Sequence, residues 1–397
     1  MTPNDNLVVG LDIGSSNITV AICEISAVGE INLKGVGTSV CSGVIRGKIE
    51  DRDELYRSLD RALRRAERVS GLKATQAVTN VPFFGTSFMH NTGFVLSKEE
   101  SGQISQVEKM ECIRRSKNAT RSQNQTLMHV IPTEFRVDGL AVQNPVDVFG
   151  SHLEVTTHLV FGSSETIMTL TQLLKELGLK ISGIVFDPLA SAQVFLREQE
   201  RESGVTFMDI GGRFTKVSVF KHNKLQSAVL VPVGGETFTS DVSKCLNVTI
   251  PEAERLKIVY GDVILSRVDK EKKVTANTKT DGRIDVQKYY LCQILEARLK
   301  ELTVMIRKTL KLEQLPIVIG GGGGLLTGLT DYFRSEFGVS VRSGLPEEIK
   351  SVIENAGQAS AIGLILYGMK SNAIIHEAQT KKGIGSLVGQ WARGFLS

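Results

Sequence analysis

Hydrophobic positions near the start of the chain alternate with polar ones at the period of two that is typical of strands. Residues 7–22 predict a hairpin of two strands, and residues 205–219 repeat the pattern. Both copies read Asp-Ile-Gly where the first strand ends, so Asp12 and Asp209 occupy equivalent places about half the chain length apart. A repeat at this period indicates two related lobes rather than a solenoid.

The polar turn of each hairpin is a candidate phosphate site. Glycine lets the backbone approach a ligand, and successive N–H groups form a nest for an anion. An aspartate at the end of each strand suits a hydrated Mg²⁺, which needs few carboxylates. One copy alone would equally be an ordinary turn, where Asp and Gly are common, but two copies in register favour phosphate binding. The candidate residues are Gly14, Ser15, Ser16 and Asn17 in the first turn, Gly211, Gly212 and Arg213 in the second, and Asp12 and Asp209 as ligands of Mg²⁺ through water.

A third glycine-rich segment follows the predicted strand 315–319, with a helix expected after it. Strand, glycine run and helix together form a place for a nucleotide to lie against bare backbone and a helix N-terminus. A flexible linker is the alternative, but linkers are not usually flanked by a β-branched strand and an apolar helix. The predicted nucleotide contacts are Gly320, Gly321, Gly322 and Gly323, with Gly234, Gly235 and Glu236 in a weaker turn of the same kind.

These motifs, in this order, resemble the actin, hexokinase and heat-shock-chaperone ATPase superfamily, and within it the bacterial cell-division family FtsA. The resembling segments are 11–16 and 209–212 for the phosphate motifs, 319–322 for the adenosine motif, 188–191 and 361–364 for two connecting helices, and 251–257 for a stretch beside the adenine and ribose. The resemblance implies that ATP and Mg²⁺ are the cofactors and that Glu254 and Lys257 contact the nucleotide. The alternative for these two residues is an ordinary helix with solvated charges.

The small domain that distinguishes FtsA from other actin relatives has a counterpart in residues 129–135, followed by Asn144-Pro145. A helix is predicted over 165–177, with Ser164 as its N-cap and Gly178 as its stop. The expected fold is α/β: an actin-like, ribonuclease H-like duplicated fold of two lobes, with an inserted small α+β domain and a C-terminal amphipathic helix. The expected division is 1–83, 162–203 and 361–370 for the first lobe core, 84–161 for the inserted domain, 204–245 and 312–360 for the second lobe core, 246–311 for its appendage, 371–383 for a linker and 384–397 for the amphipathic helix.

Two departures from the family pattern bear on catalysis. Relatives usually carry Gly-Gly-Gly-Thr where this chain has Arg213, which could pair with the γ-phosphate or crowd it. Relatives that hydrolyse ATP quickly often carry Glu or Gln before Pro-Leu-Ala, and this chain has Asp187. Asp187 and Asp209 are the candidate catalytic residues, and the shorter reach of Asp187 predicts slow or absent hydrolysis.

The segment 384–397 predicts an amphipathic helix whose apolar residues fall at i, i+3, i+4, i+7, i+11 and i+12. These residues are Ile384, Leu387, Val388, Trp391, Phe395 and Leu396. Lys381 and Lys382 lie just upstream, and each contributes about 1 kcal/mol near an anionic lipid surface. A helix packed onto the protein is the alternative, but the glycines make this segment a poor helix in water. We expect it to bind an anionic membrane surface.

Residues 285–310 predict a helix similar to the one through which FtsA binds the C-terminal peptide of the tubulin homologue FtsZ. Arg298 is the candidate partner contact, and an exposed helical charge is the alternative. The resemblance further implies a homopolymer, later division membrane proteins as partners, and a place at the division site on the cytoplasmic face of the plasma membrane.

Composition and charge narrow the classes of protein to which the chain can belong. A chain of 397 residues with 41% hydrophobic and 23% charged residues is typical of a soluble globular protein with two lobes. The net charge of +4 does not demand a nucleic-acid partner, and we expect none. Five scattered cysteines without a CxxC pair indicate a reducing compartment and no structural zinc.

The motifs and the resemblance together favour an ATP-binding division protein that polymerises on the inner membrane and tethers FtsZ filaments. A pilus-assembly adaptor of the same fold and a sugar or metabolite kinase of the same superfamily remain alternatives.

Overall fold

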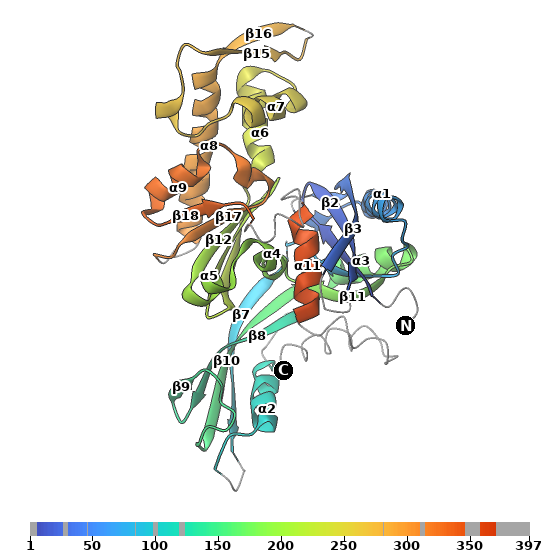
Figure 1. Cartoon of the computed structure of the whole chain (residues 1–397), viewed down its shortest axis with the longest axis vertical. Coiled ribbons are helices and arrows are strands. Elements are labelled where there is room, and N and C mark those ends of the chain that lie inside the picture. The colour runs from blue at the N-terminus through green and yellow to red at the C-terminus, as the bar shows by residue number, and fades with distance from the viewer. Residues whose placement is uncertain are drawn as a thin grey trace. The chain divides into compact units, whose positions relative to one another are not determined.

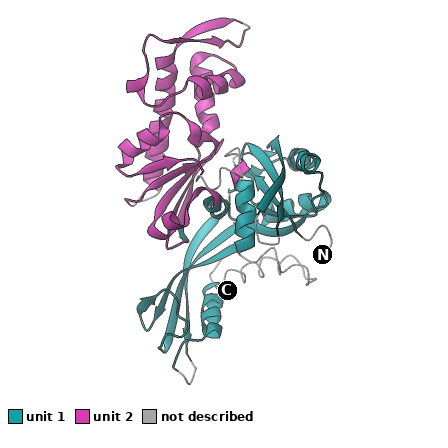
Figure 2. Ribbon diagram, in the orientation of Figure 1, with its two compact units in different colours: residues 1–193, 224–226, 360–397 teal, residues 194–223, 227–359 magenta. Residues whose placement is uncertain are grey.

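The chain is described here from a computed structural model, which divides it into two compact units (Figure 2). Unit 1 holds Met1–Gln193, Lys224–Gln226 and Ser360–Ser397, and unit 2 holds Val194–Asn223 and Ser227–Ala359. The residues that the structure describes are 6–26, 31–45, 47–83, 85–97, 102–118, 124–280, 282–309, 314–345 and 358–370. The expected linker 371–383 and amphipathic segment 384–397 lie outside them.

Unit 1 is built on a five-stranded sheet of order β11-β6-β1-β2-β3 (Figure 1). Its strands are β1 (Leu7–Ile13), β2 (Asn17–Ile25), β3 (Ile31–Val40), β6 (Gln76–Asn80) and β11 (Lys180–Val185), and a short hairpin is formed by β4 (Val44–Ile45) and β5 (Lys48–Ile49). Strand β1 pairs antiparallel with β2 and parallel with β6, and β6 pairs parallel with β11. The carboxyl ends of β1, β6 and β11 therefore meet at one edge of the sheet.

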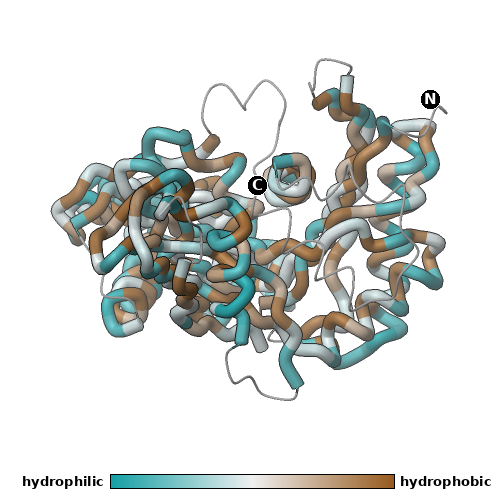
Figure 3. The backbone as a smooth tube through the Cα atoms, turned by 90° about the horizontal axis from the view of Figure 1, so that it is seen from below, coloured by the Kyte–Doolittle hydropathy of each residue, from teal (hydrophilic) through white to brown (hydrophobic). Residues whose placement is uncertain are grey.

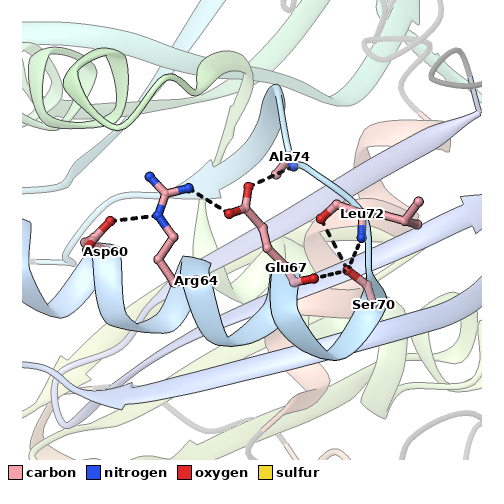
Figure 4. A network of polar contacts seen from close by, with 6 residues as sticks. All are labelled: Asp60, Arg64, Glu67, Ser70, Leu72 and Ala74. Carbon is pink, nitrogen blue, oxygen red and sulfur yellow. Dashed lines mark hydrogen bonds and ion pairs between the residues drawn. The ribbon is translucent and has the colours of Figure 1, made fainter.

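Helix α1 (Arg52–Ser70) packs against β2 and β3 through a buried stripe that includes Leu55, Leu59 and Leu63. Asp51 caps its start by accepting a hydrogen bond from the Glu54 N–H, and it ends at Gly71. On its outer face Arg64 pairs with Asp60 and Glu67, as Figure 4 shows. Carboxylates of the same helix therefore partly neutralise its arginines.

Three further helices lie wholly or largely in unit 1: α3 (Ser164–Glu176), α4 (Asp187–Phe195) and α11 (Ala359–Lys370). Helix α3 ends close to the predicted stop at Gly178, but its N-cap is Ser163 rather than Ser164. Ser163 accepts a hydrogen bond from the Thr166 N–H, whereas the Ser164 hydroxyl contacts that of Thr126 over 2.8 Å. The cap lies one residue earlier because strand β10 ends at Ser163 and the helix follows it directly.

The inserted segment forms its own antiparallel sheet of order β7-β10-β8-β9. Its elements are β7 (Ser87–Leu96), α2 (Gln106–Ser116), β8 (Gln125–Val137), β9 (Leu140–Val142) and β10 (His152–Ser163). Helix α2 packs on β7 and β10, and Val95, Phe135 and Leu153 belong to the hydrophobic core of this sheet. The segment therefore carries a core of its own.

Unit 2 repeats the first sheet as β14-β13-β12-β17-β18. Its strands are β12 (Val205–Ile210), β13 (Thr215–Lys221), β14 (Lys224–Val231), β17 (Ile317–Gly320) and β18 (Val341–Ser343). An antiparallel hairpin, β12 with β13, is flanked by two parallel strands, as β1 with β2 is flanked by β6 and β11. The predicted duplication is confirmed.

The rest of unit 2 is mainly helical. Its elements are α5 (Glu198–Ser203), α6 (Gly235–Leu246), α7 (Ile250–Tyr260), η1 (Leu265–Arg267), β15 (Lys273–Asn277), β16 (Arg283–Gln287), α8 (Lys288–Thr309), η2 (Gly322–Leu325) and α9 (Leu329–Phe337). Helix α8 begins at Lys288 rather than near residue 285, because β16 pairs with β15 as far as Gln287. The glycine run forms the short η2, and the helix expected after it begins at Leu329.

Hydrophobic and hydrophilic stretches alternate along the described chain (Figure 3). Among the described helices, none combines the length and apolar character needed to cross a membrane.

Candidate nucleotide site

The two Asp-Ile-Gly turns have the same backbone hydrogen bond. Gly14 N–H donates to the Asn17 carbonyl over 3.0 Å, and Gly211 N–H donates to the Phe214 carbonyl over 2.9 Å. In both hairpins the strands pair up to the residue before the glycine. The duplicated sequence therefore folds into duplicated turns, one in each unit.

In unit 1 the turn lies beside a cluster of three polar side chains located at or just beyond the carboxyl ends of three strands. Asn80, at the end of β6, donates from its amide nitrogen to Asp12 Oδ1 over 2.6 Å and to Asp187 Oδ1 over 3.0 Å. Its amide oxygen accepts from the Ile13 N–H over 2.7 Å. Asn80 and Asp187 are buried. Asp12 and Asp187, both predicted site residues, are thus brought together by a residue that sequence reasoning missed.

The remaining predicted residues of the first turn have distinct surroundings. The Ser16 hydroxyl oxygen is buried and has no hydrogen-bond partner in this structure, so an anion at the turn would supply one. The Ser16 carbonyl accepts from the Cys41 N–H over 2.8 Å. Ser15 is half-buried and Asn17 is exposed.

In unit 2 the second turn packs against the start of α6. Gly235 N–H donates to the Gly211 carbonyl over 2.9 Å, and Glu236 N–H donates to the Gly212 carbonyl over 2.7 Å. A side chain at Gly234 would overlap both carbonyls. The predicted residues Gly211, Gly212, Gly234, Gly235 and Glu236 therefore form one backbone-lined surface.

The glycine run after β17 completes this surface. Gly321 has φ +77°, a backbone conformation that side-chain-bearing residues rarely adopt, and a Cβ there would collide with the Asp209 carboxylate. A Cβ on Gly235 would lie 4.0 Å from Gly323 Cα and 3.6 Å from Lys257 Nζ. Gly322 has open space where a Cβ would be. Gly320 differs, because it is the buried end of β17 and faces the rings of Phe195 and Phe207.

Lys257 and Glu254 lie at this surface on α7. Lys257 Nζ donates to Glu254 Oε2 over 2.7 Å, to the Gly235 carbonyl over 3.0 Å and to Thr239 Oγ1 over 2.9 Å. Thr239 also donates to the Glu254 carboxylate. The lysine is mostly covered while the glutamate is 43% exposed, so the glutamate is the more accessible of the two to a ligand.

Two ion pairs hold charged side chains beside the second turn. Arg213 Nε donates to Glu236 Oε2 over 3.0 Å, and Lys216 Nζ lies 3.3 Å from Asp209 Oδ2. Among the described residues there is no cluster of three or more His, Cys, Asp or Glu side chains suited to a metal. Hydrated Mg²⁺ needs only one or two carboxylates, so the residues present fit that ion and a nucleotide.

Arg298, the predicted partner contact, is half-buried rather than freely exposed. Its guanidinium makes two hydrogen bonds to Asp241 on α6, of 2.5 Å and 3.0 Å, and also pairs with Glu301. These hydrogen bonds raise the pKa of Arg298 against the opposing effect of desolvation. The arginine therefore joins α6 to α8.

Comparison with known proteins decides the family. The family model described as "Cell division protein FtsA" matches residues 206–363, and "SHS2 domain inserted in FTSA" matches residues 86–161. Cell division protein FtsA of Borreliella burgdorferi is 28% identical over 374 residues, covering 91% of each chain. That of Escherichia coli K12 is 27% identical over 406 aligned residues, covering 98% of this chain and 96% of the relative. The chain belongs to the FtsA family.

The fold of this FtsA-family chain is shared with solved actin-like structures. The PilM-PilN type IV pilus biogenesis complex has a TM-score of 0.65 at 18% identity, covering 91% of this chain and 98% of that one. MreB 5 of Spiroplasma citri bound to AMPPNP has a TM-score of 0.57 at 13% identity, covering 95% of this chain and 100% of that one. At these identities the likeness shows the fold alone. Fold and family together make this chain an actin-like cell-division protein.

Proposed function

We propose that the chain binds ATP with Mg²⁺, polymerises on the inner membrane and tethers FtsZ filaments to it, recruiting later division membrane proteins. The observation that carries the proposal is the pair of Asp-Ile-Gly turns with matching hydrogen bonds, in a chain of the FtsA family. Each turn would bring a polyphosphate against its backbone, with a nearby aspartate for the cation.

Unit 2 would hold the nucleoside. Bare backbone at Gly235, Gly321 and Gly323 lets a flat base or a ribose approach closely, and Glu254 offers carboxylate oxygens as hydrogen-bond acceptors. Lys257 is fixed by three hydrogen bonds and supplies positive charge near the turn at Gly211. These residues bind and orient the nucleotide.

Two aspartates are proposed to contact Mg²⁺ through water: Asp12, which Asn80 holds by a hydrogen bond, and Asp209. When bound, Mg²⁺ neutralises phosphate charge and orients the terminal phosphate. Asp187 would orient water, and its short, hydrogen-bonded side chain favours slow turnover. We therefore propose ATP as an assembly ligand.

The membrane contact would be made by the segment 384–397, whose apolar residues include Trp391 and Leu387. One short amphipathic helix binds a bilayer weakly and reversibly. A filament presents many such helices at once, so polymerisation would raise the overall affinity without any new contact. We propose that such a filament lies at the division site, on the cytoplasmic face of the membrane.

Arg298 on α8 is proposed to take part in FtsZ binding. Helix α8 carries more basic than acidic residues, and two of the basic ones, Lys300 and Arg307, pair with Glu296 and Glu336. Such a surface suits a peptide that carries acidic residues.

The test is co-sedimentation with vesicles containing anionic lipid, in the presence of ATP and Mg²⁺. The intact chain is expected to pellet, and Trp391→Glu is expected to stay in solution. Ser386→Glu is the matched control, because it adds the same charge on the polar face of the predicted helix. Sedimentation of the Trp391→Glu variant at the level of the intact chain contradicts the membrane proposal. If the intact chain binds ATP but no vesicles, the result favours the alternative function of a pilus-assembly adaptor.

A further inference from the structure

The two duplicated turns differ in charge at one equivalent position. The third residue of the first turn is Ser16, and the third residue of the second turn is Arg213. Because both turns close with the same hydrogen bond, their backbones offer equivalent places to a ligand. At the second turn this place also has a permanently charged guanidinium, since arginine does not lose its proton in proteins.

Arg213 is paired across the turn with the first turn of α6. Its Nε donates to Glu236 Oε2 over 3.0 Å, while the Glu236 N–H donates to the Gly212 carbonyl over 2.7 Å. The Arg213 and Glu236 side chains are 35% and 49% exposed. The ion pair therefore forms in contact with water, beside the glycine-lined surface of unit 2.

An exposed ion pair of this kind stabilises a protein very little, so a stronger anion can replace the carboxylate. A terminal phosphate has three oxygens and more negative charge than a carboxylate, and it accepts two parallel N–H bonds from a guanidinium. Glu236 also repels a phosphate that approaches the turn. A phosphate would therefore be a better partner for the guanidinium than Glu236, with which it pairs in this structure.

We propose that Arg213 distinguishes a nucleoside triphosphate from a diphosphate by exchanging Glu236 for the terminal phosphate. The proposal rests on the proposed nucleotide binding and adds the residue that makes it selective. A diphosphate lacks the group that reaches the turn, so it leaves the pair of Arg213 with Glu236 in place. Glu236 opposes triphosphate binding and Arg213 favours it.

The test compares the Mg²⁺-dependent affinities for ATP and ADP of four proteins by titration calorimetry. Arg213→Ala is expected to bind ATP about ten-fold more weakly, the size expected for a lost charge-assisted contact, with ADP affinity within about two-fold. Glu236→Gln is expected to bind ATP several-fold more tightly than the unmodified chain. Arg267→Ala is the matched control, because Arg267 forms an exposed ion pair with Asp331 elsewhere in unit 2.

Equal losses for ATP and ADP in Arg213→Ala overturn the proposal, since they show that the arginine supports the turn without sensing the third phosphate. Unchanged affinities overturn it as well, since the ion pair is then a surface contact only. If the unmodified chain binds neither nucleotide, the proposed function itself fails, and that result is distinct from a loss of selectivity. Thermal unfolding without nucleotide verifies that each variant is folded.

Discussion

The side-chain amide of Asn80 donates a hydrogen bond to the carboxylate of Asp187 over 3.0 Å. The same nitrogen donates to Asp12 over 2.6 Å, so one buried residue joins the two acidic side chains that follow β1 and β11. An amide carries no charge, and it therefore orients both carboxylates without neutralising them.

Replacing Asn80 with Ala is expected to weaken ATP binding about ten-fold when Mg²⁺ is present, because the carboxylates lose their orientation. Binding measured in EDTA should change much less, since no cation is then coordinated. The unpaired Ile13 N–H should also lower the free energy of unfolding by about 1–3 kcal/mol. Titration calorimetry with and without Mg²⁺ and urea denaturation give the three values. Equal weakening with and without Mg²⁺ would show that Asn80 serves the fold alone.

Substitution of Gly321 by Ala is expected to destabilise unit 2 and reduce nucleotide affinity, because the new Cβ meets the Asp209 carboxylate and the Ile210 carbonyl. Gly338→Ala is the matched control. Gly338 also has a positive φ, +67°, but it lies in the left-handed helical region with open space where a Cβ would be, so alanine there costs only about 1–2 kcal/mol of backbone strain. Gly321 has ψ 168°, a conformation that essentially only glycine adopts, so alanine there adds further backbone strain to the collision. Urea denaturation of both variants should give the larger loss at Gly321. A loss at Gly321 no greater than that at Gly338 would contradict the tight packing described here.

The stability of unit 1 is expected to fall on mild acidification because of His129. Burial lowers the pKa of this side chain from 6.5 to about 3, and its Nε2 accepts a hydrogen bond from the Phe186 N–H. Between these two pKa values the unfolded chain binds a proton that the folded chain does not, so stability rises with pH. The contribution of neutral His129 to the free energy of unfolding is complete above about pH 6.5 and is lost as the pH falls toward 3.

At pH 5 this effect amounts to about 2 kcal/mol relative to pH 7, from the 1.4 kcal/mol of each pKa unit. His129→Gln keeps a neutral hydrogen-bond acceptor and removes the titrating group, so its stability should depend less on pH. Urea denaturation of both proteins at several pH values provides the comparison. Parallel pH profiles for the two proteins would show that His129 does not titrate as proposed.

Arg298 and Asp241 offer a way to separate partner binding from folding. Arg298→Ala should lower the free energy of unfolding by about 1–3 kcal/mol and weaken binding of an FtsZ C-terminal peptide. Asp241→Ala should cause a similar destabilisation but leave the guanidinium paired with Glu301 alone, so peptide binding should be kept or strengthened. Fluorescence anisotropy with a labelled peptide measures this. Loss of peptide binding in both variants would indicate that the pair only fixes α6 against α8.

The duplicated turns could be predicted from the sequence because each is encoded locally, by one strand, the Asp-Ile-Gly turn and a second strand in immediate succession. The cluster around Asn80 could not be predicted from the sequence in the same way. Asn80 lies 68 residues from Asp12 and 107 from Asp187, and only the parallel pairing of β1, β6 and β11 brings the three together. An asparagine at the last position of a buried strand was the available signal.

Side-chain pairing was equally invisible in the sequence. Arg298 reads as an exposed charge on its helix, but Asp241 on α6 covers it from a position 57 residues away. Gly320 reads as part of the nucleotide-binding run, but it faces the rings of Phe195 and Phe207 in the core, because β17 extends one residue into the glycines. Local patterns identify the turns, and long-range packing decides which neighbouring residues are free to bind.

Helix α11 packs so closely on β1 that a side chain at Gly10 would overlap the Ala361 carbonyl. Strand β1, the earliest of the described strands in the chain, is therefore covered by the last described helix. Unit 2 is almost continuous in sequence and is synthesised before α11. During translation unit 2 can complete its core first, while unit 1 keeps apolar β1 surface open until residue 370 has been made. In the interval between these two events, the open apolar surface of β1 favours aggregation.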